Sequence, residues 1–316
     1  MRHLAALLLA FSIVAVTMPV TAQEQEPVLP AGIAPELLAR GRDALEAENF
    51  EQSILDFSLY ILLNPTDARG YYLRGLGYYN LQDLDSAVDD LTFGLRYSED
   101  VPELRAALLG TRSEFYTLLG DDTAAIQDLD ALIAIHPSPE AFAQRAILRL
   151  SGSAFEEAVT DLDEAIDLAS GNQPALYFYR AHAQDALQNQ RAAASDYLEW
   201  VNGMSQQTTD EGPLESGGAV TLQMAQSLVY RIAFDAQQGD EINVLVRAVA
   251  GDIDPLLVLL APDGTPLVGN DDARVGRDTN AVVTGYEAPE AGAYHLLVTH
   301  SISGYNGRVQ VLLETR

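Results

Sequence analysis

The amino-acid sequence predicts a protein of two folded parts: an N-terminal α-helical solenoid of about five helix pairs, followed by an antiparallel β-sandwich or jelly-roll domain. The first observation is a pattern of Arg, small residue and Asp that recurs five times at a spacing of about 34 residues. The second is a change in hydrophobic periodicity from 3.6 to 2 beyond residue 218. The third is the length of 316 residues with 48% hydrophobic composition, which suffices for two cores.

Residues 1–22 have the features of a secretory signal peptide. Arg2 and His3 give a positive start, an apolar run follows, and small residues precede a cleavage site after Ala22. The apolar run is too short to span a bilayer. Residues 23–33 are rich in Pro and are expected to form an exposed linker. We therefore expect the mature chain in the periplasm or outside the cell, with no direct membrane insertion after signal removal.

Residues 34–203 contain the repeats. Each recurring Arg is followed sixteen residues later by an Asp, which gives the pairs Arg40–Asp56, Arg74–Asp90, Arg112–Asp128, Arg145–Asp161 and Arg180–Asp196. A small residue follows each Arg, and another stands three positions before each Asp, so that two antiparallel helices can approach closely where they cross. Because an unpaired buried charge is costly, we interpret the pairs as structural contacts that fix helix register rather than as a ligand site.

These columns resemble the tetratricopeptide repeat, whose pattern has a large residue at position 4, small residues at positions 8 and 20, and Pro near position 32. Pro65 and Pro137 fit the last position, whereas repeats two, four and five depart from it with Glu99, Ser170 and Ser205. The resemblance implies a concave groove, lined by the first helix of each repeat, that holds an extended peptide or a partner segment. Carried over residue by residue, the groove would include Leu38, Arg42, Arg69, Tyr72, Leu76, Tyr79, Ile147, Phe178 and His182. Aromatic residues are common anchors of binding patches, so Tyr72, Tyr79 and Phe178 are the strongest candidates.

Residues 204–218 are rich in Ser, Thr, Gln and Gly and are expected to form a second linker, and residues 219–316 are expected to form the sandwich. Apolar residues alternate in several segments there, as in Tyr230, Ile232 and Phe234. The segments "VYRIAFDAQQGDEINVLV", "DIDPLLVLLAPDGTPLVGNDD" and "APEAGAYHLLVT" resemble the bacterial pre-peptidase C-terminal domain. That resemblance implies a non-catalytic module for secretion, targeting or attachment.

Two acidic loops in the sandwich are candidates for calcium binding. Hard cations prefer clustered oxygen ligands, and the residues concerned are Asp252, Asp254, Asn270, Asp271, Asp272 and Asp278. Their spacing does not match a helix-loop-helix calcium site. Solvated loop carboxylates and turn-forming side chains are the alternative interpretation.

The composition excludes several function classes. A formal net charge of -28 disfavours nucleic acid as a partner. The chain has no Cys and no Lys, and it shows none of the common catalytic or nucleotide-binding motifs. We therefore expect an exported, non-enzymatic scaffold without a cofactor, calcium excepted, that binds a protein or peptide partner in the repeat groove. The alternative is an envelope or extracellular attachment protein, in which the sandwich binds calcium, glycan or another surface component and the repeats act as a spacer.

Overall fold

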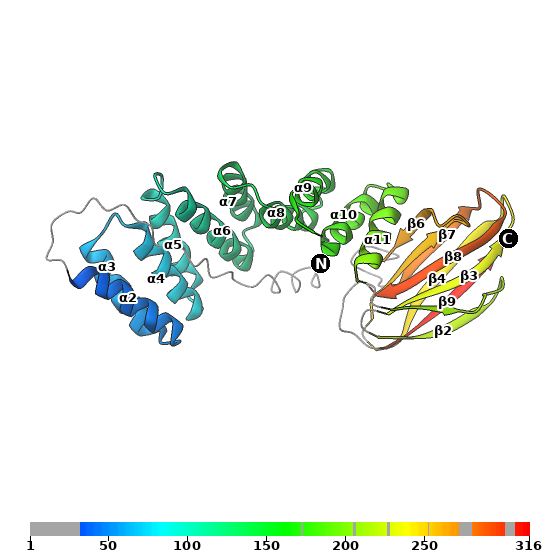
Figure 1. Cartoon of the computed structure of the whole chain (residues 1–316), viewed down its shortest axis with the longest axis horizontal. Coiled ribbons are helices and arrows are strands. Elements are labelled where there is room, and N and C mark those ends of the chain that lie inside the picture. Colours follow the sequence, from blue (N-terminus) through cyan, green and yellow to red (C-terminus); the bar gives the residue numbers. More distant parts are fainter. Residues whose placement is uncertain are drawn as a thin grey trace. The chain divides into compact units, whose positions relative to one another are not determined.

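The computed structural model describes residues 32–171, 173–204, 207–225, 228–251, 253–271, 280–300 and 307–316 (Figure 1). The expected signal peptide and nearly all of the first linker lie outside these residues. The chain forms two compact units, and the boundary between them falls at Leu148 and Arg149.

The first unit is built from antiparallel helix pairs. Its helices are α2 (Ile33–Glu46), α3 (Phe50–Leu63), α4 (Ala68–Asn80), α5 (Leu84–Arg96), α6 (Pro102–Leu119), α7 (Asp122–Ile135) and most of α8 (Pro139–Ser151). Small residues occupy the crossing points: a Cβ added at Gly41 would lie only 2.5 Å from the Phe57 ring. Ala87 and Ala125 are fully buried at the corresponding positions of the second helices. The two columns of small residues therefore set how closely each helix pair packs.

A repeated turn joins the two helices of each pair. Glu48, Gln82, Gly120, Ser153 and Gln188 all have positive φ angles, and one of them is Gly. The residue that follows is the N-cap of the second helix, and the side chains of Asn49, Asp83 and Asp121 each accept a hydrogen bond from a backbone N–H of the first turn. This N-cap satisfies a donor that the helix itself leaves unpaired.

The second unit combines helices with two β-sheets. Its helices are the end of α8, α9 (Phe155–Leu168), α10 (Pro174–Ala186) and α11 (Gln190–Met204). The strands are β1 (Gln207–Glu211), β2 (Ala219–Met224), β3 (Leu228–Ala236), β4 (Glu241–Gly251), β5 (Pro255–Leu260), β6 (Pro266–Asn270), β7 (Ala281–Glu287), β8 (Gly292–His300) and β9 (Gly307–Thr315). One sheet has the order β1-β3-β8-β5-β6 and the other β2-β9-β4-β7.

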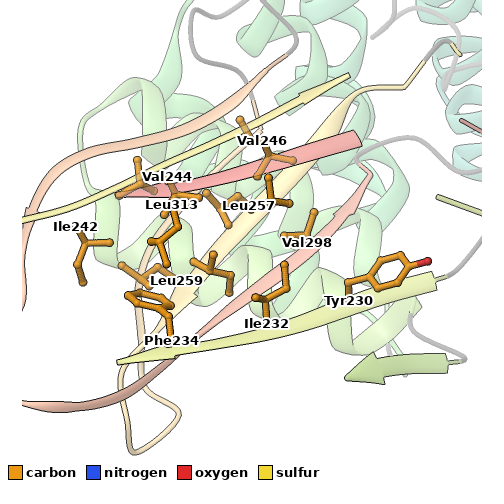
Figure 2. Close-up of a cluster of buried hydrophobic side chains, with 14 of the residues drawn as sticks. Tyr230, Ile232, Phe234, Ile242, Val244, Val246, Leu257, Leu259, Val298 and Leu313 are labelled. Carbon is orange, nitrogen blue, oxygen red and sulfur yellow. The ribbon is translucent and has the colours of Figure 1, made fainter. Parts of the chain in front are cut away.

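The two sheets pack face to face around one apolar cluster. Ile232 and Phe234 from β3, Leu257 and Leu259 from β5, and Val244 from β4 meet in this core (Figure 2). The expected purely antiparallel sandwich is wrong in one respect, because β1 pairs in parallel with β3 and makes the first sheet mixed. The other described strand pairs are antiparallel.

The stretch expected to be a linker, residues 204–218, belongs in large part to the β domain. It contains β1, and beyond that strand the N–H of Leu214 donates to the carbonyl of Ala233 and the N–H of Gly217 to the carbonyl of Leu313. Polar residues such as Gln207 and Thr208 suit an edge strand that pairs on one side only, so composition alone does not distinguish this edge from a linker.

Within the described residues, none of the helices is long and apolar enough to cross a membrane.

Candidate peptide-binding groove

The recurring Arg and Asp residues form ion pairs that join the two helices of a repeat. Arg74 donates from Nε and Nη2 to Asp90 at 2.8 and 2.7 Å, and Arg112 makes the same two contacts with Asp128 at 2.7 and 2.6 Å. In the second unit Arg180 and Asp196 repeat this geometry at 2.8 and 2.7 Å. Arg40 also pairs with Asp56. This bidentate contact, in which two N–H groups of one guanidinium bond to one carboxylate, fixes the relative position of the two helices more tightly than a single point charge would.

The same arginines also reach the preceding repeat. Nη1 of Arg74 donates to Ser58 at 3.0 Å, and Nη1 of Arg112 donates to Thr92 at 2.8 Å. The remaining contacts of this kind run from Arg145 to Asp130 and from Arg180 to Asp163, both at 2.6 Å. Each acceptor stands two residues after the paired Asp of its own repeat. One guanidinium therefore joins the two helices of its own repeat and also holds that repeat against the preceding one.

Two further observations concern the first and fourth repeats. Arg40 has no repeat before it among the described residues, and its side chain is 53% exposed, against 16% for Arg112. In the fourth repeat Asp161 accepts a hydrogen bond from Nη1 of Arg149. The second, third and fifth repeats share the geometry in which Nε and Nη2 of the Arg donate to the Asp sixteen residues later.

The predicted groove residues of α4 are half-buried between α4 and α6. The ring of Tyr79 stacks on Phe115 with centroids 4.7 Å apart. Tyr72 and Leu76 pack against the buried cluster that contains Leu108 and Phe115. Burial raises the pKa of the Tyr72 hydroxyl, and a hydrogen bond with Thr111 partly offsets that effect. Both rings are therefore partly covered by α6 and partly exposed.

Near the start of the array, the groove positions are more open and more polar. Arg42 is exposed and Leu38 is half-buried on α2. Arg69 is exposed but held, because it donates to the carboxylate of Asp67 from Nε and Nη2 at distances between 2.6 and 3.1 Å. Burial raises the pKa of Asp67, but its hydrogen bonds with Arg69 and Tyr60 outweigh burial and leave that pKa lowered.

Ile147 and Phe178 lie in packed surroundings. The Ile147 side chain is 5% exposed, so it supports the repeat rather than offering a surface to a ligand. In the second unit Phe178 packs against Trp200 with ring centroids 5.1 Å apart and contacts Tyr197 edge-on. His182, one turn further along α10, is half-buried. Phe178 and His182 are therefore half-buried, as are Tyr72 and Tyr79, and Ile147 is the one predicted groove residue that is buried.

The calcium candidates do not gather into one ligand set within the described residues. Asn270 accepts the N–H of Val282 with its side-chain oxygen at 2.8 Å, and Asp271 accepts the hydroxyl of Tyr197 at 3.0 Å. Asp252, Asp272 and Asp278 lie outside the described residues. Where side chains are described, no group of three or more His, Cys, Asp or Glu has a metal-binding arrangement. Asn270 and Asp271 therefore have structural roles that the sequence did not suggest.

Helix α11 packs on the outer face of the mixed sheet, a contact that the sequence interpretation missed. Tyr197 and Trp200 join Val229, Leu256 and Val258 in a second apolar cluster. A Cβ added at Gly269 would lie 2.7 Å from Cδ2 of Tyr197, so β6 approaches the helix at the limit that glycine allows. The available signal was the unbroken apolar run Pro255–Leu260, which is buried on both faces.

The described helices define the first part of the chain as a tetratricopeptide-like array of helix pairs, continued by a domain of two β-sheets. No protein-family model matches the chain. Among curated proteins, tetratricopeptide repeat protein 13 of Homo sapiens is 21% identical over 165 residues, which is 48% of this chain and 19% of that protein. The chain therefore spans about a fifth of the length of this relative.

Two solved structures were matched over about half of this chain. The crystal structure of MamA protein superposes with a TM-score of 0.49 and 13% identity, covering 54% of this chain and 91% of that one. The crystal structure of YrrB, titled "a TPR protein with an unusual peptide-binding site", has a TM-score of 0.47 and 14% identity, covering 54% of this chain and 86% of that one.

Proposed function

We propose that this chain is an exported, non-enzymatic scaffold that binds an extended peptide or partner segment in the groove of repeats one and two. The observation that carries the proposal is the pair of half-buried tyrosines on α4. Tyr79 stacks on Phe115 of α6, and Tyr72 packs against the buried cluster that contains Leu108 and Phe115 of the same helix. Aromatic rings that are fixed in this way lose little further freedom when a ligand covers them, which favours their use as anchors.

The charges around these rings indicate a ligand with both apolar and polar positions. Arg42 is exposed at one end of the groove, and Glu114 is exposed on α6 beyond Tyr72. A bound segment would place apolar side chains on the tyrosines and an acidic side chain near Arg42. The proposal of export is based on the signal peptide expected at residues 1–22. The resemblance of the second domain to the pre-peptidase C-terminal domain also supports an exported protein.

The test is a selection from a random peptide library on the full mature chain, followed by measurement of Kd for the selected peptides. Tyr72→Ala and Arg42→Glu should each weaken binding by about tenfold, or about 1.4 kcal/mol. Tyr97→Ala is the matched control, because Tyr97 is an exposed tyrosine that follows α5, a second helix. Unchanged affinity in both groove variants, with intact melting curves, would refute this location.

The alternative function, attachment through the β domain by calcium or glycan, has less support. Asn270 and Asp271 are engaged by Val282 and Tyr197, so binding a cation there would require these contacts to break. A calcium titration followed by thermal melting distinguishes the two proposals. A calcium-dependent rise in Tm that is lost in Asp271→Ala would favour attachment.

A further inference from the structure

Helix α3 carries a row of exposed leucines on the face that points away from its own core. Leu55, Leu59 and Leu62 are 53%, 41% and 76% exposed. Spacings of four and three residues place them on one side of the helix, over a length of about 10 Å. We call these three residues the leucine stripe. On the other side of α3, Phe57 and Tyr60 are buried. The helix is thus apolar toward solvent as well as toward its core, which a surface helix does not need for folding.

The other repeats supply an internal comparison for these positions. Aligned on the recurring Asp, the column of Leu55 contains Asp89, Gln127, Thr160 and Ser195, and the column of Leu62 contains Arg96, Ala134, Asp167 and Asn202. The column of Leu59 contains Phe93, Ala131, Glu164 and Glu199. The repeat fold therefore accepts polar or small residues at these positions. Leu63 differs, since its column also contains Tyr97, Ile135 and Leu168, so the repeat pattern itself accounts for it.

The negative charge around the leucine stripe indicates which kind of partner can bind there. Glu48 and Glu51 are exposed at the N-terminal end of the leucine stripe, and Glu51 lies one turn before Leu55 on the same face. The whole chain has a formal net charge of -28, which opposes a second copy of itself and an anionic membrane surface. A helical segment with basic side chains beside an apolar face complements both the leucine stripe and the negative charge around it.

We propose that the leucine stripe is a second docking surface, separate from the groove, for an amphipathic helical segment with an apolar face and basic flanking residues. The partner helix lays its apolar side chains along Leu55, Leu59 and Leu62, as amphipathic helices do on apolar surfaces. Its Lys or Arg residues face Glu48 and Glu51. The groove tyrosines belong to the first helices and the stripe to a second helix, so the two surfaces are tested by different variants.

The test uses the full mature chain and a synthetic helical peptide of Leu and Lys, with Leu at positions i, i+3, i+4 and i+7. Fluorescence anisotropy should show binding that Leu59→Gln/Leu62→Gln weakens at least about tenfold. Leu118→Gln/Leu119→Gln is the matched control, because these leucines are 52% and 45% exposed on α6. That control, and Tyr72→Ala in the groove, should stay within about twofold of the unmodified chain. Both double variants change exposed residues, so their melting curves should match that of the unmodified chain.

A site-specific readout is available because the chain contains no Cys. A photocrosslinker attached at Leu62→Cys should capture the peptide, and one attached at Leu118→Cys should not. The proposal is overturned by equal affinity in the stripe variant, or by equally tight binding of a peptide in which Glu replaces Lys. A dimer that Leu59→Gln/Leu62→Gln dissociates would instead assign the stripe to a second copy. Retention on phosphatidylcholine vesicles that the variant abolishes would assign it to lipid.

Discussion

Removal of Asp128 should destabilise the first unit strongly, because it leaves Arg112 without its carboxylate. Arg112 is 16% exposed and Asp128 7%, and two hydrogen bonds of 2.6 and 2.7 Å join them. Breaking a buried pair by deleting one partner costs about 3 kcal/mol or more. For a unit of this size we expect Asp128→Ala to lower Tm by about 6–12 °C.

Asp130→Ala is a control on the same helix. Asp130 also pairs with an Arg, Arg145, but its side chain is 53% exposed, so its loss should cost less than about 1 kcal/mol. Circular dichroism at increasing urea measures both variants. The double change Arg112→Met/Asp128→Leu should recover most of the stability, because apolar residues of similar volume can replace a buried pair. Equal midpoints for Asp128→Ala and Asp130→Ala would refute the structural role of the pair.

Three further predictions concern other parts of the chain. Gly269→Val should destabilise the second unit by about 1–3 kcal/mol, since a side chain there meets Tyr197 and Ala194. Trp200 is the only tryptophan and lies in the same apolar cluster as Tyr197, so its fluorescence reports the unfolding. Gly212→Val is the control, because a Cβ there meets open space, and it should leave the unfolding free energy unchanged. The pKa of Asp67 is lowered from its usual 3.8, so its ionised form stabilises the native state above that pH, and this contribution is lost as the pH falls below it. The free energy of unfolding of Asp67→Asn, measured by urea denaturation, should therefore lie about 1 kcal/mol below that of the unmodified chain at neutral pH and approach it near pH 3; a difference that does not change with pH would contradict this. Mass spectrometry of the exported protein should find Gln23 as the first residue, and an intact N-terminus would contradict the signal peptide.

Features that are local to one repeat could be predicted from the sequence. Helix pairs and their crossing points follow from the period and from the small residues, such as Gly41 opposite Phe57. The spacing of sixteen residues between Arg and Asp spans a single turn between two helices, so contacts such as Arg74–Asp90 need no knowledge of the rest of the fold. The contact of each Arg with the preceding repeat also has a signal in the sequence. Its acceptors form a column of oxygen-bearing side chains in the aligned repeats, namely Ser58, Thr92, Asp130 and Asp163.

Features that depend on distant segments could not be predicted in the same way. The oxygen-rich loop around Asn270 resembles a cation site in sequence, but α11 lies against it and Tyr197 donates to Asp271 across a separation of 74 residues. Strand β1 has the composition of a linker, and its partner β3 begins beyond another strand. Phe178 occupies a groove position in the repeat pattern, yet it packs on Trp200.

Strand β5 limits how this chain can evolve. Leu257 and Leu259 face the core between the sheets, whereas Leu256, Val258 and Leu260 face α11 and its neighbours. Duplication of a helix pair ahead of α10 leaves that arrangement untouched. Insertion of a pair after α11 would separate five outward-facing apolar side chains, including those of Val229 and Leu297, from the helix that covers them. Gain and loss of repeats should therefore be confined to the part of the array ahead of α10, and the last pair should be inherited together with the β domain as one block.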